Sequence, residues 1–557
     1  MTSKQPFKGV VRVALAFCVG LGVACSTPAP KELSEAQQLE TSLHKGAVIA
    51  GDNPDPSVIR VGTTYWATAT SSAWAPEFSI LRSEDLVNWS IAGAVFQKRP
   101  NWTDGNYWAP EIAQLGSSFY VYYAARQKGV HGHMCLGVAT ASKPEGPYQD
   151  HGPITCHAVG AIDAAPVVDD AGNRYLIWKE DGNSVKAPTP IRIQKLSVDG
   201  LRLEGPLQEL IRNDVPWERE LVEGPFIKKH GDYWYLFYSG NSCCGRECNY
   251  ALGVARSHDL LGKWEKNPAN PVLKGNAVWK CPGHGSIVTD AQNRDVLLYH
   301  AYHARDFVYV GRQALADQID WQSNGWPTIN QGEGPSLHAD GFLGVKLQNQ
   351  EHHFQDSFAG PALAPGWQWP QNDEPQVTFV KSKSKPGATQ LLLKPGKQFG
   401  RKFGKRSAAA KNALAAVLAR PTTTGDYTAV TEFDVASLVK GTQAGLSAYG
   451  EAPSALGLGY RDGELHVWKR EKGKTEILGT WAAPKGPLLQ LRMTARQGYL
   501  FRFEASTDGK SWTQVGDELN GEYLPPWDLG IRVALTVGGA RGASARFNSF
   551  QITPVLP

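Results

Sequence analysis

Four strongly polar side chains occupy equivalent positions in a short sequence motif that recurs along the first half of the chain. The motif is a Pro or Ser followed by mostly branched apolar residues, a turn, and an aromatic or apolar run. Counted from that Pro or Ser, its five copies lie at positions 56, 110, 166, 225 and 286. Four copies carry a titratable group within three residues of this point: Asp55, Asp163, Glu223 and His284. The second copy carries Trp108 and Glu111 instead.

Three carboxyl groups brought to one site can hydrolyse a glycosidic bond. One protonates the leaving oxygen, a second takes a proton from the attacking water, and a third tunes the proton affinity of the acid. An inverting reaction needs a gap of ~6.5–9.5 Å between acid and base, which leaves room for the water. The residue types therefore favour an acid–base hydrolase over a structural core.

A repeated unit must position these groups, because they lie up to 229 residues apart in the sequence. The period drifts between 54 and 61 residues, which fits a blade of four strands of about 50 residues in all. Aromatic and β-branched runs such as Tyr65-Trp-Ala-Thr-Ala-Thr and Trp234-Tyr-Leu-Phe-Tyr predict extended chain. We therefore predict an all-β protein with a five-bladed β-propeller whose first strands line a central channel.

A chain of 557 residues is too long for one core. We assign residues 45–345 to the propeller. Residues 352–557 contain short alternating runs, such as Leu488-Leu-Gln-Leu-Arg-Met, separated by turn residues, and they predict a β-sandwich. The net charge of +4 is mild and gives no indication of nucleic-acid binding.

The first residues have the pattern of an export signal. Positive charges precede a short apolar run that ends in small residues before Cys25, so residues 1–25 are assigned to a signal peptide or lipoprotein leader and 26–44 to a linker. We expect an exported protein with lipidation of Cys25, attached to the membrane of a bacterial envelope only through that anchor. The alternative is a periplasmic or secreted protein after simple cleavage.

Six further cysteines in an exported chain predict disulfide bonds. Spacing favours a Cys135–Cys156 bond and a cluster around one loop, formed by Cys243, Cys244, Cys248 and Cys281. The alternative is a metal knot, but the cluster lacks the paired C-x-x-C spacing of zinc sites.

Three segments in the first half of the chain resemble motifs of glycoside hydrolase family 43. Members of this family are five-bladed propeller enzymes acting on arabinose- and xylose-containing plant polysaccharides. The resemblance covers roughly residues 50–330. Asn53-Pro-Asp-Pro-Ser is similar to the general-base motif and implies that role for Asp55. Gly160-Ala-Ile-Asp-Ala-Ala-Pro implies that Asp163 orients the substrate and modulates the acid, and Val222-Glu-Gly-Pro-Phe implies that Glu223 is the general acid.

The resemblance implies further site residues. His284, in Gly283-His-Gly-Ser, corresponds to a channel histidine that is often near a water-coordinated calcium, and Arg312 corresponds to an arginine that reaches the sugar. Trp74 and Trp108 are candidates for aromatic walls of the first sugar pocket. No cofactor is required, and a structural calcium is implied by resemblance only.

The expected mechanism inverts the anomeric configuration. We expect Glu223 to be protonated near neutral pH, because burial and the charge of Asp163 raise its pKa, and Asp55 to remain ionised. Each residue also has a plainer interpretation: Asp55 and Asp163 could be turn residues. Leu203-Glu-Gly-Pro repeats the acid motif without a following apolar strand, so we place Glu204 in an outer loop.

The second half of the chain narrows the range of expected activities. Residues 356–369 are similar to the concanavalin-like module of β-xylosidases and exo-arabinosidases. We therefore expect an exo-acting α-L-arabinofuranosidase acting on arabinan, arabinoxylan or derived oligosaccharides, with β-xylosidase and endo-1,5-α-L-arabinanase as alternatives. A non-catalytic glycan-binding surface lipoprotein is the alternative of another class. Such a lectin would repeat one set of sugar-binding residues in every blade, and this chain does not.

Overall fold

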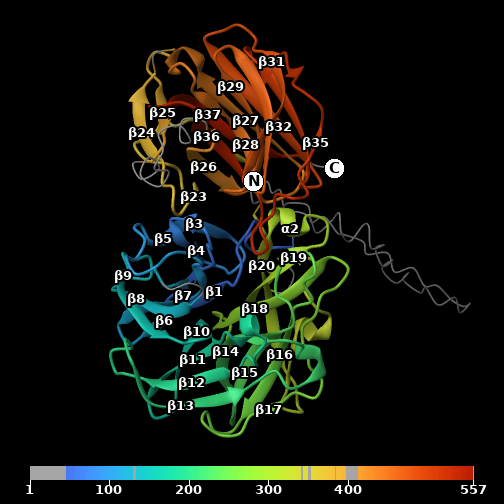
Figure 1. The fold of residues 1–557 in the computed structure, drawn as a ribbon. Coiled ribbons are helices and arrows are strands. Elements are labelled where there is room, and N and C mark those ends of the chain that lie inside the picture. The colour runs from blue at the N-terminus through green and yellow to red at the C-terminus, as the bar shows by residue number, and fades with distance from the viewer. Residues whose placement is uncertain are drawn as a thin grey trace, which may run out of the picture.

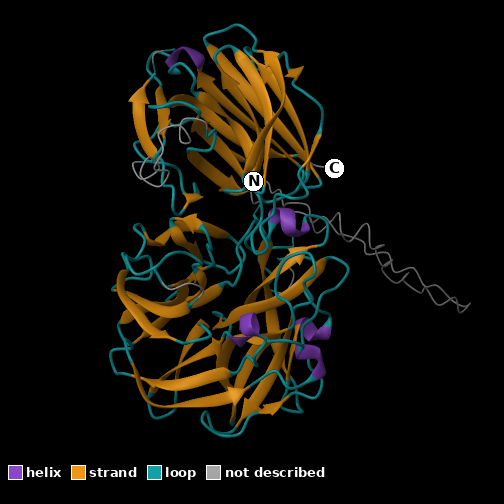
Figure 2. Ribbon diagram, in the orientation of Figure 1, coloured by secondary structure: helices purple, strands orange, loops and turns teal. Residues whose placement is uncertain are grey.

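The chain folds into two all-β bodies, one above the other in Figure 1. The structure is a computed structural model that describes residues 46–129, 133–339, 343–348, 353–382, 384–396 and 412–555. The lower body runs from blue to yellow-green and the upper body from gold to red, and strands dominate both bodies (Figure 2). The leader, the linker and Cys25 lie outside the described residues.

The first body is a five-bladed propeller, as predicted. Its described residues form five four-stranded antiparallel sheets, and in every sheet the strands pair in chain order. The blades are β1 (Ser57–Val61), β2 (Thr64–Thr68), β4 (Glu77–Ser83) and β5 (Trp89–Phe96); β6 (Trp108–Leu115), β7 (Ser118–Arg126), β8 (Met134–Ala141) and β9 (Gln149–Cys156); β10 (Ala161–Val168), β11 (Arg174–Glu180), β12 (Ile191–Leu196) and β13 (Leu203–Ile211); β14 (Val222–His230), β15 (Tyr233–Gly240), β16 (Ala251–Ser257) and β17 (Glu265–Lys266); β18 (Trp279–Thr289), β19 (Asp295–His303), β20 (Arg312–Trp321) and β21 (Pro327–Ile329).

The recurring sequence motif marks the inner strand of each blade, namely β1, β6, β10, β14 and β18. Apolar clusters fill the spaces between neighbouring blades, and one of them joins Val167 and Ile177 of the third blade to Leu236 of the fourth. The ring closes where Ile49 forms a bridge with Ala314 of β20, with Ala314 N donating to Ile49 O at 3.1 Å. The segment before the first blade is therefore hydrogen-bonded to the last blade, which fixes the inner strands around one channel.

The second body is the predicted β-sandwich. Along β32 every second residue is buried, from Leu489 to Ala495, which is the alternation of a strand with one face on a core. The nine-stranded sheet contains β22 (Phe354–Asp356), β24 (Gln376–Lys381), β25 (Thr389–Lys394), β27 (Tyr427–Asp434), β32 (Leu488–Arg496), β33 (Leu500–Ser506), β34 (Thr513–Gln514), β35 (Leu519–Asn520) and β37 (Ala545–Pro554). The six-stranded sheet contains β26 (Ala416–Pro421), β28 (Gln443–Glu451), β29 (Ser454–Arg461), β30 (Glu464–Glu471), β31 (Lys474–Ala482) and β36 (Arg532–Gly538).

The two bodies are joined by paired strands and by a buried ion pair. The short strands β3 (Trp74–Ala75) and β23 (Trp369–Pro370) pair across the boundary. Arg532 Nη1 of the sandwich lies 2.6 Å from Oδ2 of Asp52, and Arg532 is only 2% exposed. Because Asp52 lies three residues before Asp55, this contact fixes the sandwich next to the segment that leads into β1.

Helical segments in the described residues are short. They are η1 (Gly182–Val185), η2 (Pro216–Glu218), α2 (Phe307–Val310), η3 (Asn330–Gly332) and η4 (Val435–Ser437). Within the described ranges, no helix has the length and apolar character needed to span a bilayer.

The cysteines form disulfides, as predicted. Cys135 and Cys156 face each other across β8 and β9 and are bonded. The loop cluster contains two bonds, Cys243–Cys244 and Cys248–Cys281. Glu204 lies on β13, the exposed outermost strand of the third blade, rather than in a loop.

Candidate active site

The inner strands turn their polar residues toward one another at β-bulges. The pairing register shifts between Ile162 and Ala165 in β10, between Glu223 and Phe226 in β14, and around His284 in β18. Asp163 and His284 have φ of 61° and 42°, and Asp55, just before β1, has φ of 51°. Such values are uncommon for residues other than glycine, and together with bulges they redirect side chains and mark functional sites.

Asp55 is held by four groups. Arg312 Nη1 donates to its Oδ1 at 2.9 Å, and Thr70 Oγ1 donates to its Oδ2 at 2.7 Å. His300 Nδ1 lies 3.2 Å from Oδ1 and His284 Nδ1 lies 3.5 Å from it. Burial alone would raise the pKa of Asp55, but Arg312, followed by His284, outweighs burial and holds the pKa well below its usual value. Asp55 is therefore an ionised carboxylate, as a general base must be.

His300 is a neutral imidazole beside this carboxylate. Burial, followed by the charge of Arg312, lowers its pKa to about 4. Its Nδ1 can then accept the backbone N–H of Asp55 at 3.1 Å. His300 thus holds the backbone of Asp55 in its left-handed conformation.

Asp163 lies between His284 and the strand of Glu223. The backbone N–H of Gly224 donates to its Oδ2 at 2.9 Å, and His284 Nδ1 lies 4.0 Å from the same oxygen. Burial raises the pKa of Asp163 to about 6, with His284 opposing this effect and the charge of Glu223 adding to it. His284 therefore bridges Asp55 and Asp163.

The pKa of Glu223 differs from the expectation. Lys179 Nζ lies 2.7 Å from its Oε2, and Tyr250 Oη donates to its Oε1 at 2.8 Å. Burial would raise the pKa of Glu223, but Lys179 and the Tyr250 hydrogen bond lower it overall. The prediction that Glu223 is protonated near neutral pH is therefore wrong for the unliganded protein, because Lys179 was not foreseen. Of this pair of carboxyls, Asp163 has the raised pKa.

The sandwich reaches the same site through residues 526–529. Arg312 Nη2 donates to the carbonyl oxygen of Asp528 at 3.2 Å, and Ser72 Oγ donates to Asp528 Oδ2 at 2.5 Å. The Trp527 ring meets the Trp108 ring edge to face at a centroid distance of 5.8 Å. Ser72, Trp108 and residues 526–529 line a cavity of about 300 Å³ at the boundary of the two bodies.

The two tryptophans predicted as sugar-pocket walls lie in different environments. Trp108 is half-buried, and its Nε1 donates to Ser72 Oγ at 2.9 Å. Trp74 is only 2% exposed and packs against Tyr449 and Arg532 of the sandwich. Both border the 300 Å³ cavity, but the Trp74 ring serves mainly to pack the two bodies together.

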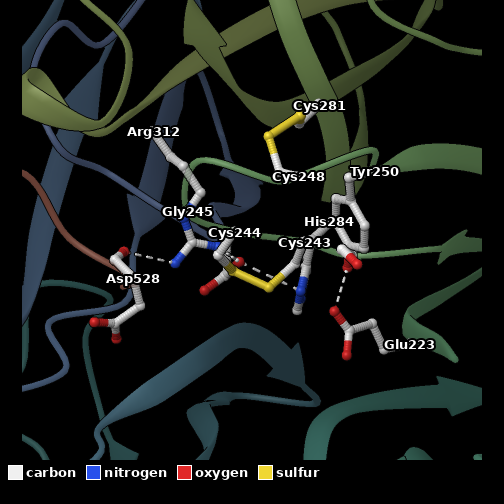
Figure 3. The surroundings of a disulfide bond; sticks show 12 residues. Glu223, Cys243, Cys244, Gly245, Cys248, Tyr250, Cys281, His284, Arg312 and Asp528 are labelled. Atoms are coloured by element: carbon white, nitrogen blue, oxygen red, sulfur yellow. Dashed lines mark hydrogen bonds and ion pairs between the residues drawn. A yellow bond between two sulfur atoms is a disulfide. The ribbon is translucent and has the colours of Figure 1, made fainter. Parts of the chain in front are cut away.

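The loop of residues 241–249 carries both of its disulfides to this site. Figure 3 shows the Cys243–Cys244 bond between the Arg312 guanidinium and the His284 ring. The Gly245 backbone N–H donates to Tyr302 Oη at 3.2 Å, and Cys248 is bonded to Cys281, three residues before His284. The loop ends at Tyr250, the partner of Glu223.

Lys179, Tyr250 and His300 were not identified from the sequence. Lys179 ends the apolar run Tyr175-Leu-Ile-Trp, and His300 interrupts a similar run in β19. A charged or polar residue at the end of an apolar run, or within one, on a second strand was the available signal. Tyr250 carried no such signal, because buried tyrosines are common in this propeller.

The comparisons with known proteins decide the family. Residues 45–327 match the model of glycosyl hydrolases family 43, and residues 355–552 match the beta xylosidase C-terminal concanavalin A-like domain. The chain belongs to glycosyl hydrolase family 43. As a family 43 protein it is a glycoside hydrolase, and its reaction inverts the anomeric configuration.

Curated relatives differ in activity. An extracellular exo-α-(1→5)-L-arabinofuranosidase of Cellvibrio japonicus is 29% identical over 51% of this chain and 87% of its own length. A xylan 1,3-β-xylosidase of a Vibrio species is 26% identical over 58% of this chain and 64% of its own length. An extracellular endo-α-(1→5)-L-arabinanase of Bacillus subtilis is 25% identical over 49% of this chain and 86% of its own length. Family 43 membership therefore leaves the sugar and the exo or endo mode open.

Solved structures share the fold of both bodies. The BlXynB protein of Bacillus licheniformis has a TM-score of 0.77 at 24% identity and covers 92% of this chain and all of its own. A Bacteroides ovatus family 43 protein from a xyloglucan locus has a TM-score of 0.74 at 20% identity, over 92% of this chain and 99% of its own. Family 43 enzymes generally need no cofactor, and the described residues contain no group of three or more His, Cys, Asp or Glu side chains suited to a metal.

Proposed function

We propose that this family 43 protein is an exo-acting glycosidase that removes a terminal α-L-arabinofuranose from arabinan, arabinoxylan or oligosaccharides derived from them. The observation that carries the exo mode is the approach of residues 526–529 of the sandwich. Asp528 accepts a hydrogen bond from Arg312, which itself contacts Asp55, and Trp527 packs on Trp108. A site bounded on one side by a second domain fits a chain end better than a continuous polysaccharide.

In the proposed mechanism, Asp55 takes a proton from water as the water attacks the anomeric carbon. Its low pKa supports this role, since the Asp55 carboxylate is ionised over the whole pH range in which we expect activity. Glu223 protonates the leaving oxygen, and Asp163 with its pKa of about 6 supplies the neighbouring site where that proton is held in the free enzyme. His284 lies between the base and Asp163, where it can orient both.

β-Xylosidase is the second candidate, favoured by one specific observation. The sandwich matches the C-terminal domain that is described for β-xylosidases. Parallel assays on nitrophenyl α-L-arabinofuranoside and β-D-xylopyranoside separate the two candidates. We expect a higher kcat/KM on the arabinofuranoside; turnover of the xylopyranoside alone would replace the first candidate by the second.

The exo mode has its own test. Linear arabinan is incubated with the protein, and viscosity is followed together with reducing ends. An exo enzyme releases arabinose while viscosity changes little, whereas a rapid fall in viscosity at few new ends would identify an endo-arabinanase. Proton NMR of the first product should show the inverted anomer, and the retained anomer would remove Asp55 from the role of base.

We further propose export and lipidation of Cys25, based on the leader pattern of residues 1–25. Labelling of expressing cells with a fatty-acid analogue should mark the native protein but not Cys25→Ala. A structural calcium through His284 is proposed by family resemblance only. Melting curves with calcium and with a chelator should differ if that ion is bound.

A further inference from the structure

A second hollow lies beside the candidate active site, on the edge of the fourth and fifth blades. It is a groove of about 1150 Å³, lined by residues just before β14, by the disulfide loop of residues 241–249, and by residues just before and at the start of β18. None of the three catalytic carboxyl residues lines it. The groove is therefore separate from the site where bond cleavage is proposed.

The groove is strongly positive. Four cationic side chains line it, and Glu220 is the one acidic residue in its lining; the cations are Arg219, Arg246, Lys274 and Lys280. In the part of the chain that the structure describes, none of these four cations lies within 4.0 Å of a carboxylate oxygen. All four residues are exposed. Since the whole chain has a net charge of only +4, a surplus of three positive charges in one groove is a local feature.

Arg219 adds a second observation. Its backbone has φ of 52° and ψ of −120°, a conformation that glycine adopts far more easily than arginine. This conformation is unfavourable for a residue with a side chain, and such strain is retained mostly at functional positions. An arginine rather than a glycine therefore stands at the rim of the groove, where its charge can be used.

The groove lies on the leaving-group side of the proposed reaction. It is bordered by Tyr250, whose hydroxyl donates to Glu223 Oε1, and by Leu221, two residues before Glu223. A general acid gives its proton to the leaving oxygen, so the departing part of the substrate lies on the same side of the cleaved bond as Glu223. The Trp217 ring in the lining supplies an apolar face on which a sugar ring can pack. The Phe307 ring is covered by Lys280, whose Nζ lies 4.9 Å from the ring centroid.

We propose that this groove binds a carboxylate-bearing sugar, a uronate, in the part of the polysaccharide that remains after the pentose is released. The inference rests on the proposed function, and it adds that the natural substrate is an acidic polysaccharide rather than neutral arabinan. Two sources provide the same chemistry: a glucuronate branch on xylan and a galacturonate backbone bearing arabinose side chains. Arg and Lys side chains recognise carboxylates by charge-assisted hydrogen bonds. Arg246 Nη2 already donates to Tyr309 Oη and to the Glu522 carbonyl oxygen, so Arg219, Lys274 and Lys280 are the cations we assign to the uronate.

The test compares each acidic substrate with its own neutral form. Arabinosylated oligosaccharides containing glucuronate or galacturonate are assayed before and after chemical reduction of the carboxyl groups, which keeps size and linkage but removes the charge. We expect kcat/KM to be roughly fivefold to tenfold higher on at least one acidic form, as a few exposed ion pairs would give. The preference should shrink at about 1 M salt, where charges are screened within about 3 Å. The source that shows the preference identifies the polysaccharide.

Variants locate the effect. Lys274→Gln combined with Lys280→Gln should bring the acidic-to-neutral ratio of kcat/KM close to one. Lys195→Gln is the matched control, because Lys195 is an exposed lysine on β12 of the third blade and lies outside the groove. Equal kcat/KM on acidic and reduced substrates in the native protein would overturn the proposal.

Binding separates this inference from the proposed function. Calorimetry with Glu223→Gln and the acidic oligosaccharides needs no turnover. Tighter binding of the acidic form, lost in the Lys274 and Lys280 double variant, would support the groove even if neither nitrophenyl pentoside were hydrolysed. Equal affinity for the acidic and reduced forms would overturn the groove while leaving the hydrolase assays to decide the reaction.

Discussion

At the scale of single residues, the charge around Glu223 decides the pH at which this family 43 site can work. Lys179 and Tyr250 contact both carboxylate oxygens of Glu223 and lower its pKa, whereas Asp163 has a pKa raised to about 6. A general acid must be protonated, so activity should be lost as pH rises through the pKa of this pair. Asp55 has a depressed pKa and stays ionised well below that point. We therefore expect an acidic optimum with an alkaline limb near pH 6.

Lys179→Met should move that limb. Removing a cation 2.7 Å from Glu223 takes away the group that lowers the carboxyl pKa, so the pKa rises by roughly one unit or more. The alkaline limb of kcat/KM should shift to higher pH by about the same amount. Lys228→Met is the control: Lys228 lies on β14, the strand of Glu223, but its ion pair is with Asp295. An unchanged pH profile in Lys179→Met would mean that Glu223 does not set the limb.

The chain also contains a matched control for Glu223, the proposed general acid. Glu223 and Glu204 both stand in a Glu-Gly-Pro sequence, but Glu223 is 7% exposed at the inner strand and Glu204 is exposed on β13. Glu223→Ala should lower kcat/KM by about 10²–10⁴ on natural oligosaccharides, whose leaving groups need a proton. The loss should be much smaller on nitrophenyl glycosides. Glu204→Ala should change neither, and an equal loss of activity on both substrates in Glu223→Ala would contradict the acid role.

The residues at the start of the inner strands could be identified from the sequence because each occupies the same position in a repeated motif. Asp55, Asp163, Glu223 and His284 were accessible in this way. Lys179 and His300 were missed because they are on second strands, where partners across a sheet are set by register and not by sequence order. The pKa of Glu223 could not be predicted without Lys179, since burial and a nearby cation act in opposite directions.

At the scale of elements, the disulfide loop of residues 241–249 acts as a brace for two site residues. It ends at Tyr250, which donates to Glu223, and its Cys248–Cys281 bond is fixed to β18 three residues before His284. The sequence predicted that these cysteines cluster around one loop. It left the pairing open, because spacing along the chain does not say which thiols meet in space.

Removing the brace should therefore affect activity as well as stability. Cys248→Ser with Cys281→Ser should lower the free energy of unfolding by about 2–4 kcal/mol and also lower kcat/KM at temperatures far below the melting point. Cys135→Ser with Cys156→Ser is the matched pair, since that bond joins β8 and β9 on the outer side of the second blade. It should reduce stability with kcat/KM retained. If both pairs lose only stability, the loop does not position Tyr250 or His284.

At the scale of the whole molecule, the propeller and the sandwich form one working unit. The sequence predicts two domains from a change of pattern near residue 352, but it does not predict their contact. Trp527 and Asp528 reach a site built from residues 55–312. Such docking depends on the complementarity of two folded surfaces, and no local pattern encodes it.

Arg532 tests whether the docking supports catalysis. Its guanidinium is buried against Asp52, and Asp52 also accepts the backbone N–H groups of Gly530 and Arg312. Arg532→Met would leave the Asp52 charge buried without its partner, which typically costs about 3–5 kcal/mol. We expect a lower melting point and also a lower kcat/KM, because Asp52 holds the Arg312 backbone and the Arg312 guanidinium contacts Asp55.

The comparison variant is Arg496→Met, which removes a surface ion pair with Glu518 from the same sandwich. Because exposed pairs contribute about 0–1 kcal/mol, its melting point and kcat/KM should stay close to native. Activity and melting are measured on the same preparations, with kinetics taken where both variants remain folded. A normal kcat/KM in folded Arg532→Met would mean that the sandwich is attached to the propeller without shaping its active site.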